Sequence, residues 1–246
     1  METNFNEIQQ EILRRAKEAS ACKTEYSRAY AAENLSELSQ VIKDNFDWAC
    51  AYGILTVDLI EQYKEDFAAN GIYVNQNVKN GYLLCNNATV EACGNSKVEA
   101  YCNAKVEAYD SATVKAYCNA TVEAYDNATV KAYDDATVKA YDSTTVEAYD
   151  STTVEAYCSA TVEAYGSATV KAYHSTTVMV CDNATVKAYN NVTVKACDST
   201  TVEAHDNSYC TSLYTIAYKL FDHAIYRVRN TNTVYYADSD IKFVKK

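Results

Sequence analysis

The sequence predicts a mainly β protein, a β-solenoid of eight-residue repeats that follows a small helical domain. Residues 87–206 repeat about fifteen times an octad of the form Asn-Ala-Thr-Val-Lys-Ala-Tyr-Asp, with valine at the fourth position of every copy. Within each octad, Val and Ala alternate with polar or aromatic residues. A period this strict is typical of architectures in which each repeat stacks on the next.

The eight-residue period excludes a helix and favours a strand. An α-helix turns 100° per residue, so eight residues overshoot two turns by ~80° and the valines would wind around the helix. In a strand, Val and Ala share one face, whereas Thr, Glu or Lys, and Tyr share the other. The Glu or Lys that follows Val in each octad cannot line a dry core without a partner, so Val and Ala point inward. Pairs such as Asp-Ser and Asp-Asn predict corners made by Asx-type turns.

The number of octads per coil has two candidate values. Three per coil would form a triangular prism, and two would form a flat solenoid of sixteen residues per coil. The small core residues and two cysteine pairs spaced by sixteen favour two: Cys102 with Cys118, and Cys181 with Cys197. The tyrosines then stack in two ladders. One ladder holds Tyr101, Tyr117, Tyr133, Tyr149 and Tyr165, and the other holds Tyr109, Tyr125, Tyr141, Tyr157, Tyr173 and Tyr189.

Residues 1–71 are expected to form an α-helical N-terminal domain. Apolar stripes predict a helix near 5–21, a second over 35–45 capped by Asn34, and a third that starts after Thr56 and ends before Gly71, which suits the C′ position. Trp48 is expected in the core of this domain. Such a domain covers the strand edges that the first coil would otherwise expose.

The solenoid is expected over residues 72–206, where 72–86 supply degenerate entry strands. Residues 207–246 are expected to be capping strands, and Val234 still falls on the octad register. Large apolar residues of this cap can seal the last coil: Leu213, Ile216, Leu220, Phe221, Ile225, Val228, Val234, Ile241 and Phe243. The cap also carries basic residues: Lys219, Arg227, Arg229, Lys242, Lys245 and Lys246.

The chain is acidic, with a formal net charge of −11. The repeat block alone holds 17 acidic residues against 8 lysines, which argues against direct nucleic-acid binding and permits binding to a basic protein surface. Only 5 glycines occur, which excludes the calcium-binding nonapeptide β-roll. The start of the chain is polar, and no apolar run approaches ~20 residues. We therefore expect a cytoplasmic protein that does not enter a membrane and whose ten cysteines are reduced.

The repeat block, with the closing Thr231-Asn232-Thr233-Val234, resembles a group of octapeptide-repeat proteins of gut bacteria and their phages and mobile elements. The segments Asn45-Phe46-Asp47-Trp48 and Asn70-Gly71-Ile72-Tyr73 look like the helical start of that group. The resemblance implies a phage or mobile-element setting in a bacterial host. The coil is also similar to bacterial ice-nucleation repeats, which share tyrosine and threonine ladders.

Few residues suggest chemistry. Stacked aspartates at the corners, such as Asp126 with Asp142, could hold calcium, but solvated turn residues explain them better. No Cys-X-X-Cys pair supports zinc. His174, His205 and His223 are isolated, and neither a catalytic constellation nor a glycine-rich phosphate loop occurs. We therefore expect no enzyme, no cofactor and no metal.

The outer face suggests binding instead, because rigid tyrosine rows make a contact surface at low entropic cost. We expect a non-enzymatic protein-binding module, an anti-defence inhibitor whose acidic rod imitates DNA toward a host nucleic-acid-acting protein. The candidate binding residues are Tyr109, Tyr125, Tyr141, Tyr157, Tyr173, Glu123, Glu147, Glu155, Glu163, Asp126, Asp134, Asp142 and Asp150. The alternatives are an ice-binding or ordered-water-binding solenoid and a self-assembling scaffold that forms a homodimer. An enzyme in the helical domain is a more distant alternative.

Overall fold

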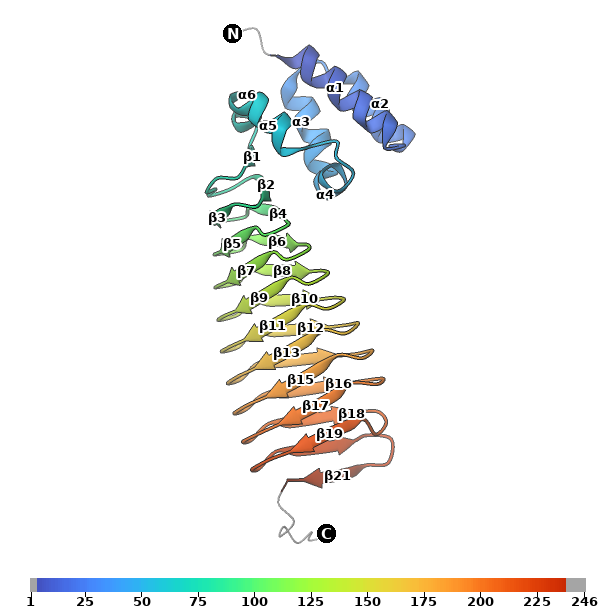
Figure 1. Ribbon diagram of the computed structural model, residues 1–246, viewed down its shortest axis with the longest axis vertical. Coiled ribbons are helices and arrows are strands. Elements are labelled where there is room, and N and C mark those ends of the chain that lie inside the picture. The colour runs from blue at the N-terminus through green and yellow to red at the C-terminus, as the bar shows by residue number, and fades with distance from the viewer. Residues whose placement is uncertain (1–3, 238–246) are drawn as a thin grey trace.

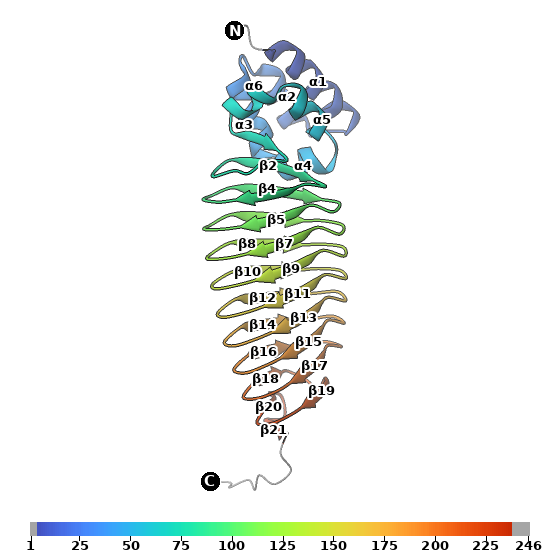
Figure 2. The same ribbon diagram turned by 60° about the vertical axis from the view of Figure 1, so that its left-hand side comes forward.

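A computed structural model describes residues 4–237 and confirms the predicted fold class. The protein is a rod in which a β-solenoid carries a group of helices at its N-terminal end (Figure 1). A turned view shows that the coils are flat and stack along one axis (Figure 2). Within residues 4–237, no helix is long and apolar enough to cross a membrane.

The N-terminal part contains short helices packed around one apolar core. Their bounds are α1 Phe5–Glu18, α2 Lys23–Ala31, α3 Leu35–Asp44, α4 Phe46–Ala51, α5 Val57–Gln62 and α6 Lys64–Ala69. The predicted caps are confirmed: the Asn34 side chain accepts a bond from the Glu37 amide at 3.0 Å, and Thr56 accepts one from the Leu59 amide. Sequence reasoning missed α2, α4 and the break between α5 and α6. Trp48 lies in α4 and is half-buried at the margin of the core.

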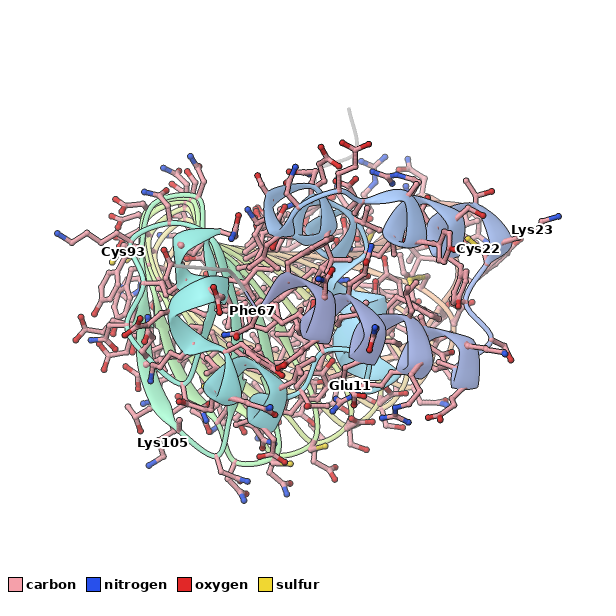
Figure 3. All side chains as sticks on the ribbon, turned by 90° about the horizontal axis from the view of Figure 1, so that it is seen from above. Glu11, Cys22, Lys23, Phe67, Cys93 and Lys105 are labelled. Atoms are coloured by element: carbon pink, nitrogen blue, oxygen red, sulfur yellow. A yellow bond between two sulfur atoms is a disulfide. The ribbon has the colours of Figure 1, made fainter. Side chains whose placement is uncertain are left out.

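The helical core continues into the first coils. Phe67 of α6 is fully buried, and the same cluster contains Ile72, Val74 and Leu84 from the first strands. Viewed along the rod axis, Phe67 lies over the first coil (Figure 3). The helical domain therefore covers the N-terminal end of the solenoid, as an end cap must.

The solenoid has two sheets, which we call sheet A and sheet B, and their strands run parallel except for the last strand of sheet A. Sheet A contains β1 Ile72–Val74, β2 Tyr82–Asn86, β4 Lys97–Tyr101, β6 Thr113–Ala116, β8 Thr129–Ala132, β10 Thr145–Ala148, β12 Thr161–Ala164, β14 Thr177–Val180, β16 Thr193–Ala196, β18 Tyr209–Ser212, β20 Ile225–Val228 and β21 Thr233–Tyr236. Sheet B contains β3 Thr89–Ala92, β5 Lys105–Ala108, β7 Thr121–Ala124, β9 Thr137–Ala140, β11 Thr153–Ala156, β13 Thr169–Ala172, β15 Thr185–Ala188, β17 Thr201–Ala204 and β19 Ala217–Leu220.

The register confirms sixteen residues per coil. Val146 pairs with Val130 and Val162, each sixteen residues away, and this offset recurs through the block. Successive octads alternate between the two sheets, so the triangular prism is ruled out. The Val and Ala columns face inward and are buried, as predicted.

A third buried column was missed by sequence reasoning. After the first octad, the second residue of the octad, usually Ala, is also buried, and at Thr144, Thr152, Thr176 and Thr200 it is threonine. The Thr144 hydroxyl donates to the carbonyl oxygens of Tyr141 and Ala124, which satisfies it inside the core. The Thr200 hydroxyl has no hydrogen-bond partner among the described residues.

The corners differ in mechanism from the expected Asx turns. The last residue of the octad adopts the left-handed conformation, for example Asp126 at φ 57° and Asp134 at φ 58°. Asp and Asn tolerate that region better than most residues do. The Asp126 carboxylate accepts the amide of Asp110, one coil earlier, at 3.2 Å, and Asp134 accepts the amide of Cys118 at 2.9 Å. The aspartates therefore bond between coils instead of closing their own turn.

The C-terminal cap corrects one register assignment. The octad column continues through Cys210, Tyr218 and Tyr226, but the chain then reverses, and β21 pairs antiparallel with β20. Val234 therefore lies opposite Arg227 instead of continuing the valine column. Tyr226 fills the end of the core, and its hydroxyl contacts Ser212. The expected cap residues Ile241, Lys242, Phe243, Lys245 and Lys246 lie outside the described residues.

The buried threonines give a test of the third column. Replacing Thr200 by valine removes an unsatisfied buried hydroxyl and should raise the free energy of unfolding by about 1 kcal/mol. Valine fits the column, because Val192 already occupies an equivalent, fully buried position. The matched variant Thr144→Val removes a bonded hydroxyl and should lower the free energy of unfolding by about 1 kcal/mol. Urea unfolding followed by circular dichroism measures both, and shifts of the same sign would contradict the assignment.

Candidate functional site

The structure distributes the predicted binding residues over both faces and both edges of the rod. The five predicted tyrosines, with Glu123 and Glu155, lie on sheet B, whereas Glu147 and Glu163 lie on sheet A. Asp126 and Asp142 follow sheet B strands and share one edge, and Asp134 and Asp150 share the opposite edge. These residues therefore do not form one surface, and each group has to be considered by itself.

The tyrosine ladder beside sheet B is confirmed and is longer than predicted. Its six rings, from Tyr109 to Tyr189, stack with centroids 4.9–5.1 Å apart and nearly parallel planes. His205 and Phe221 extend the stack by two more rings. The rings are spaced by one coil, so the ladder follows directly from parallel, in-register stacking.

The charges on the faces are largely paired. The Tyr125 hydroxyl donates to Glu123 at 3.0 Å, and Lys139 from the next coil donates to the same carboxylate at 3.1 Å. The Lys139 bond, followed by the Tyr125 bond, lowers the pKa of Glu123. On the same sheet, the hydrogen bond that the Tyr109 hydroxyl donates to Glu107 raises the pKa of Tyr109 to about 12. Along the faces, carboxylates thus accept hydrogen bonds from phenols, and several of them also form ion pairs with lysines of neighbouring coils.

Sheet A repeats this pattern with two differences. Its glutamates Glu147 and Glu163 accept bonds from Tyr149 and Tyr165 at 2.8 and 2.9 Å, and Lys131 pairs with Glu147. Its tyrosine ladder, however, stops after Tyr165. The first coils of sheet A also contact the helical domain, whose core reaches Tyr101.

A disulfide replaces the tyrosines at the interruption of sheet A. Cys181 and Cys197 are joined across two coils, with their Cα atoms 4.8 Å apart. This corrects the expectation that all the cysteines are reduced, although Cys102 and Cys118 remain free thiols. Within residues 4–237, these two sulfurs and the Asp198 carboxylate are the sole group of three potential metal ligands, all within 4.8 Å. Because the sulfurs are bonded to each other, they offer no thiolate.

A cavity of about 250 Å³ lies between the helical domain and sheet A. It is lined from α3 and α4 by Lys43, Phe46 and Asp47, and from the sheet by Tyr82, Lys97, Glu99 and Lys115. Lys115 joins the two parts of the protein through an ion pair of 2.7 Å with Asp47. Sequence reasoning missed this site, because nothing in the octad distinguishes Glu99 from the other glutamates.

Glu99 is the only buried carboxylate within residues 4–237, with 4% of its surface exposed. Its carboxylate lies 3.4 Å from the Tyr101 hydroxyl and 3.9 Å from the Lys115 ammonium. Burial raises the pKa of Glu99 from 4.5 to about 7, against the opposing effect of Lys115. Burial also raises the pKa of the neighbouring Tyr101 and Cys50. The contact between the helical domain and the solenoid therefore contains a group that titrates near neutrality.

The raised pKa of Glu99 predicts a specific pH dependence of stability. The folded protein holds the Glu99 proton more tightly than the unfolded chain, so the free energy of unfolding falls as pH rises from about 4.5 to about 7. Glu99→Gln should remove about 2.5 kcal/mol of the difference between pH 5 and pH 8. Urea unfolding at the two pH values measures this effect. The half-buried Glu163→Gln serves as control, and equal pH differences in wild type and Glu99→Gln would contradict the assignment.

The described residues thus offer two paired faces, two edges of exposed aspartates and the junction cavity that contains Glu99. No protein-family model, no curated protein and no solved structure matches this chain.

Proposed function

We propose that the protein is a non-enzymatic binding module that recognises a basic protein surface through the aspartates on its edges. The observation that carries this proposal is the contrast between faces and edges. On the faces, carboxylates such as Glu123 and Glu147 are half-buried and bonded to tyrosine and lysine. At the corners, the carboxylates of Asp126 and Asp142 are exposed, and no ion pair within residues 4–237 involves them.

The exposed carboxylates form short rows. Asp110, Asp126 and Asp142 follow three successive sheet B strands, so neighbouring members are one coil, or ~4.8 Å, apart. The opposite edge carries Asp134 with Asp135, and Asp150 one coil later. A row of fixed negative charges along a straight edge complements a groove lined by Lys and Arg.

The corners are held in place before binding. Several left-handed corners bond to the coil before them, as when the Asp134 carboxylate accepts the Cys118 amide and the Ser143 amide donates to the Asp126 carbonyl. A surface that is already ordered loses little conformational entropy when a partner docks. The formal net charge of −11 also attracts a basic partner over distance, at low salt most of all.

The partner class follows from this chemistry and from the phage or mobile-element setting that the octad resemblance implies. Proteins that act on nucleic acids present basic grooves to phosphate backbones. An acidic rod suits such a groove and would compete with the nucleic acid for it. We therefore propose an inhibitor of a nucleic-acid-acting protein in the cytoplasm of a bacterial host.

The proposal predicts that the affinity for the partner depends on the aspartates of the edges and on the salt concentration. The tagged protein should capture basic nucleic-acid-acting proteins from a bacterial lysate at low salt, and competing duplex DNA should release them. The double variant Asp126→Asn with Asp142→Asn should weaken binding to a captured protein by about tenfold, measured by titration. Affinity should also fall steeply between low and high salt.

A matched control has the same change in charge on the faces. The double variant Glu147→Gln with Glu163→Gln removes carboxylates that are already bonded to tyrosine, and it should bind nearly as well as wild type. An affinity that does not change with salt concentration, or that falls equally in both double variants, would contradict the proposal that the edges bind the partner.

A further inference from the structure

Sheet B has nine strands that follow one another along the rod. The helical domain contacts the sheet A side, where Lys115 meets Asp47. Viewed along the rod, Cys93 and Lys105 of the sheet B side project away from Cys22 and Lys23 at the far end of the helical domain (Figure 3). The six-tyrosine ladder of this face is bounded by Cys93 before Tyr109 and by His205 after Tyr189.

We propose that sheet B is a homodimer interface in which two copies pack face to face with their rods antiparallel. The two-fold axis passes between β9 and β11, at the centre of the tyrosine ladder. This inference does not depend on the proposed function, because the aspartate edges lie at the rim of the interface.

Symmetry determines which residues meet. A two-fold axis that lies in the interface along the strand direction reverses the order of the coils and keeps each column opposite itself. The ladder then meets itself completely: Tyr109 faces Tyr189 of the second copy, Tyr125 faces Tyr173, and Tyr141 faces Tyr157. Aromatic pairs across an interface are among the most favourable contacts that proteins make.

The fifth octad position of the same six coils forms a column of glutamates and lysines, which we call the charged column. In this arrangement each charge of the column faces an opposite charge of the second copy. In chain order it reads Glu107, Glu123, Lys139, Glu155, Lys171 and Lys187. Antiparallel packing places Glu107 opposite Lys187, Glu123 opposite Lys171, and Lys139 opposite Glu155. Every one of these pairs joins opposite charges, and because the axis is two-fold, each pair occurs twice.

The corner column agrees with this alignment. Its three aspartates, Asp110, Asp126 and Asp142, lie in the first half of the six coils, and its second half is Cys158, His174 and Asn190. Antiparallel packing therefore places each aspartate opposite a residue without negative charge. Just outside the six coils, Glu91 would face Glu203, so the complementary part of the charged column ends where the tyrosine ladder ends.

Other alignments are less favourable. Parallel rods would bring each charge of the column against its own copy, which repels at every coil. A shift by one coil in one direction places Glu123 opposite Glu155 and brings Asp142 against its own copy. A shift in the other direction places Lys139 opposite Lys171 and Asp110 opposite Asp206. The alignment centred on the ladder is the one without such conflicts across its six coils.

The size of the face predicts a moderate affinity. Six coils at ~4.8 Å and five residues at ~3.3 Å give a face of about 29 by 17 Å. Each copy would bury about 500 Å², and the pair about 1,000 Å², which is the lower end of the range for specific interfaces. We therefore expect a reversible dimer with a dissociation constant in the micromolar range.

Sedimentation of the full chain from about 1 to about 100 μM tests the proposal. Wild type should show a monomer–dimer equilibrium. Lys171→Glu places like charges opposite Glu123 and should raise the dissociation constant at least about tenfold. Lys195→Glu makes the same change in charge on sheet A and should leave the constant within about twofold. A wild-type protein that remains monomeric throughout would overturn the proposal.

A charge swap separates loss of the interface from misfolding. In the double variant Glu123→Lys with Lys171→Glu, the two charges again face opposite partners, so the dimer should return. Failure of the swap to restore the dimer, in a chain that keeps the wild-type circular dichroism spectrum, would overturn the assignment. So would a dimer that Lys195→Glu weakens as much as Lys171→Glu does.

Discussion

The structure depends on a core that only small side chains can fill. Valine and alanine from the two sheets, with alanine or threonine at the second octad position, occupy the narrow space between the faces of each flat coil. One strand of four residues cannot bury such a face alone, so stability comes from stacking equivalent strands in register. Any shift of one residue would move the charged column into this core.

The surface follows from the same constraint. Because the coils stack in register, residues sixteen apart lie next to each other, and like residues form columns. Tyrosines stack, as at Tyr125 and Tyr141, and unlike charges in one column pair, as at Lys171 and Glu155. The corners carry the residues that tolerate the left-handed conformation, and these leave exposed carboxylates. The backbone is nearly identical in every coil. We therefore expect the order of charges along a column to determine what the protein binds.

The fold could be predicted from sequence because its period is short and strict. The sixteen-residue coil, both tyrosine ladders and the inward valines follow from alternation and from paired substitutions. Local signals failed where long-range contacts decide. Glu99 has the same octad position as Glu123, and it is buried only because α4 packs over it. Val234 lies at the sequence position where the octad repeat would place a valine. The chain reverses before β21, so Val234 does not continue the valine column. The predicted binding residues were correctly placed in columns, but their distribution over two faces and two edges required the coil geometry.

Crosslinking of engineered cysteine pairs tests the coil most directly. Thr145 and Thr161 are partners on adjacent strands of sheet A, whereas Thr145 and Thr169 belong to different sheets. Mild oxidation should join Thr145→Cys to Thr161→Cys within one chain, as identified by peptide mass mapping, and should not join Thr145→Cys to Thr169→Cys. A crosslink between the second pair and none between the first would indicate twenty-four residues per coil and would contradict the account.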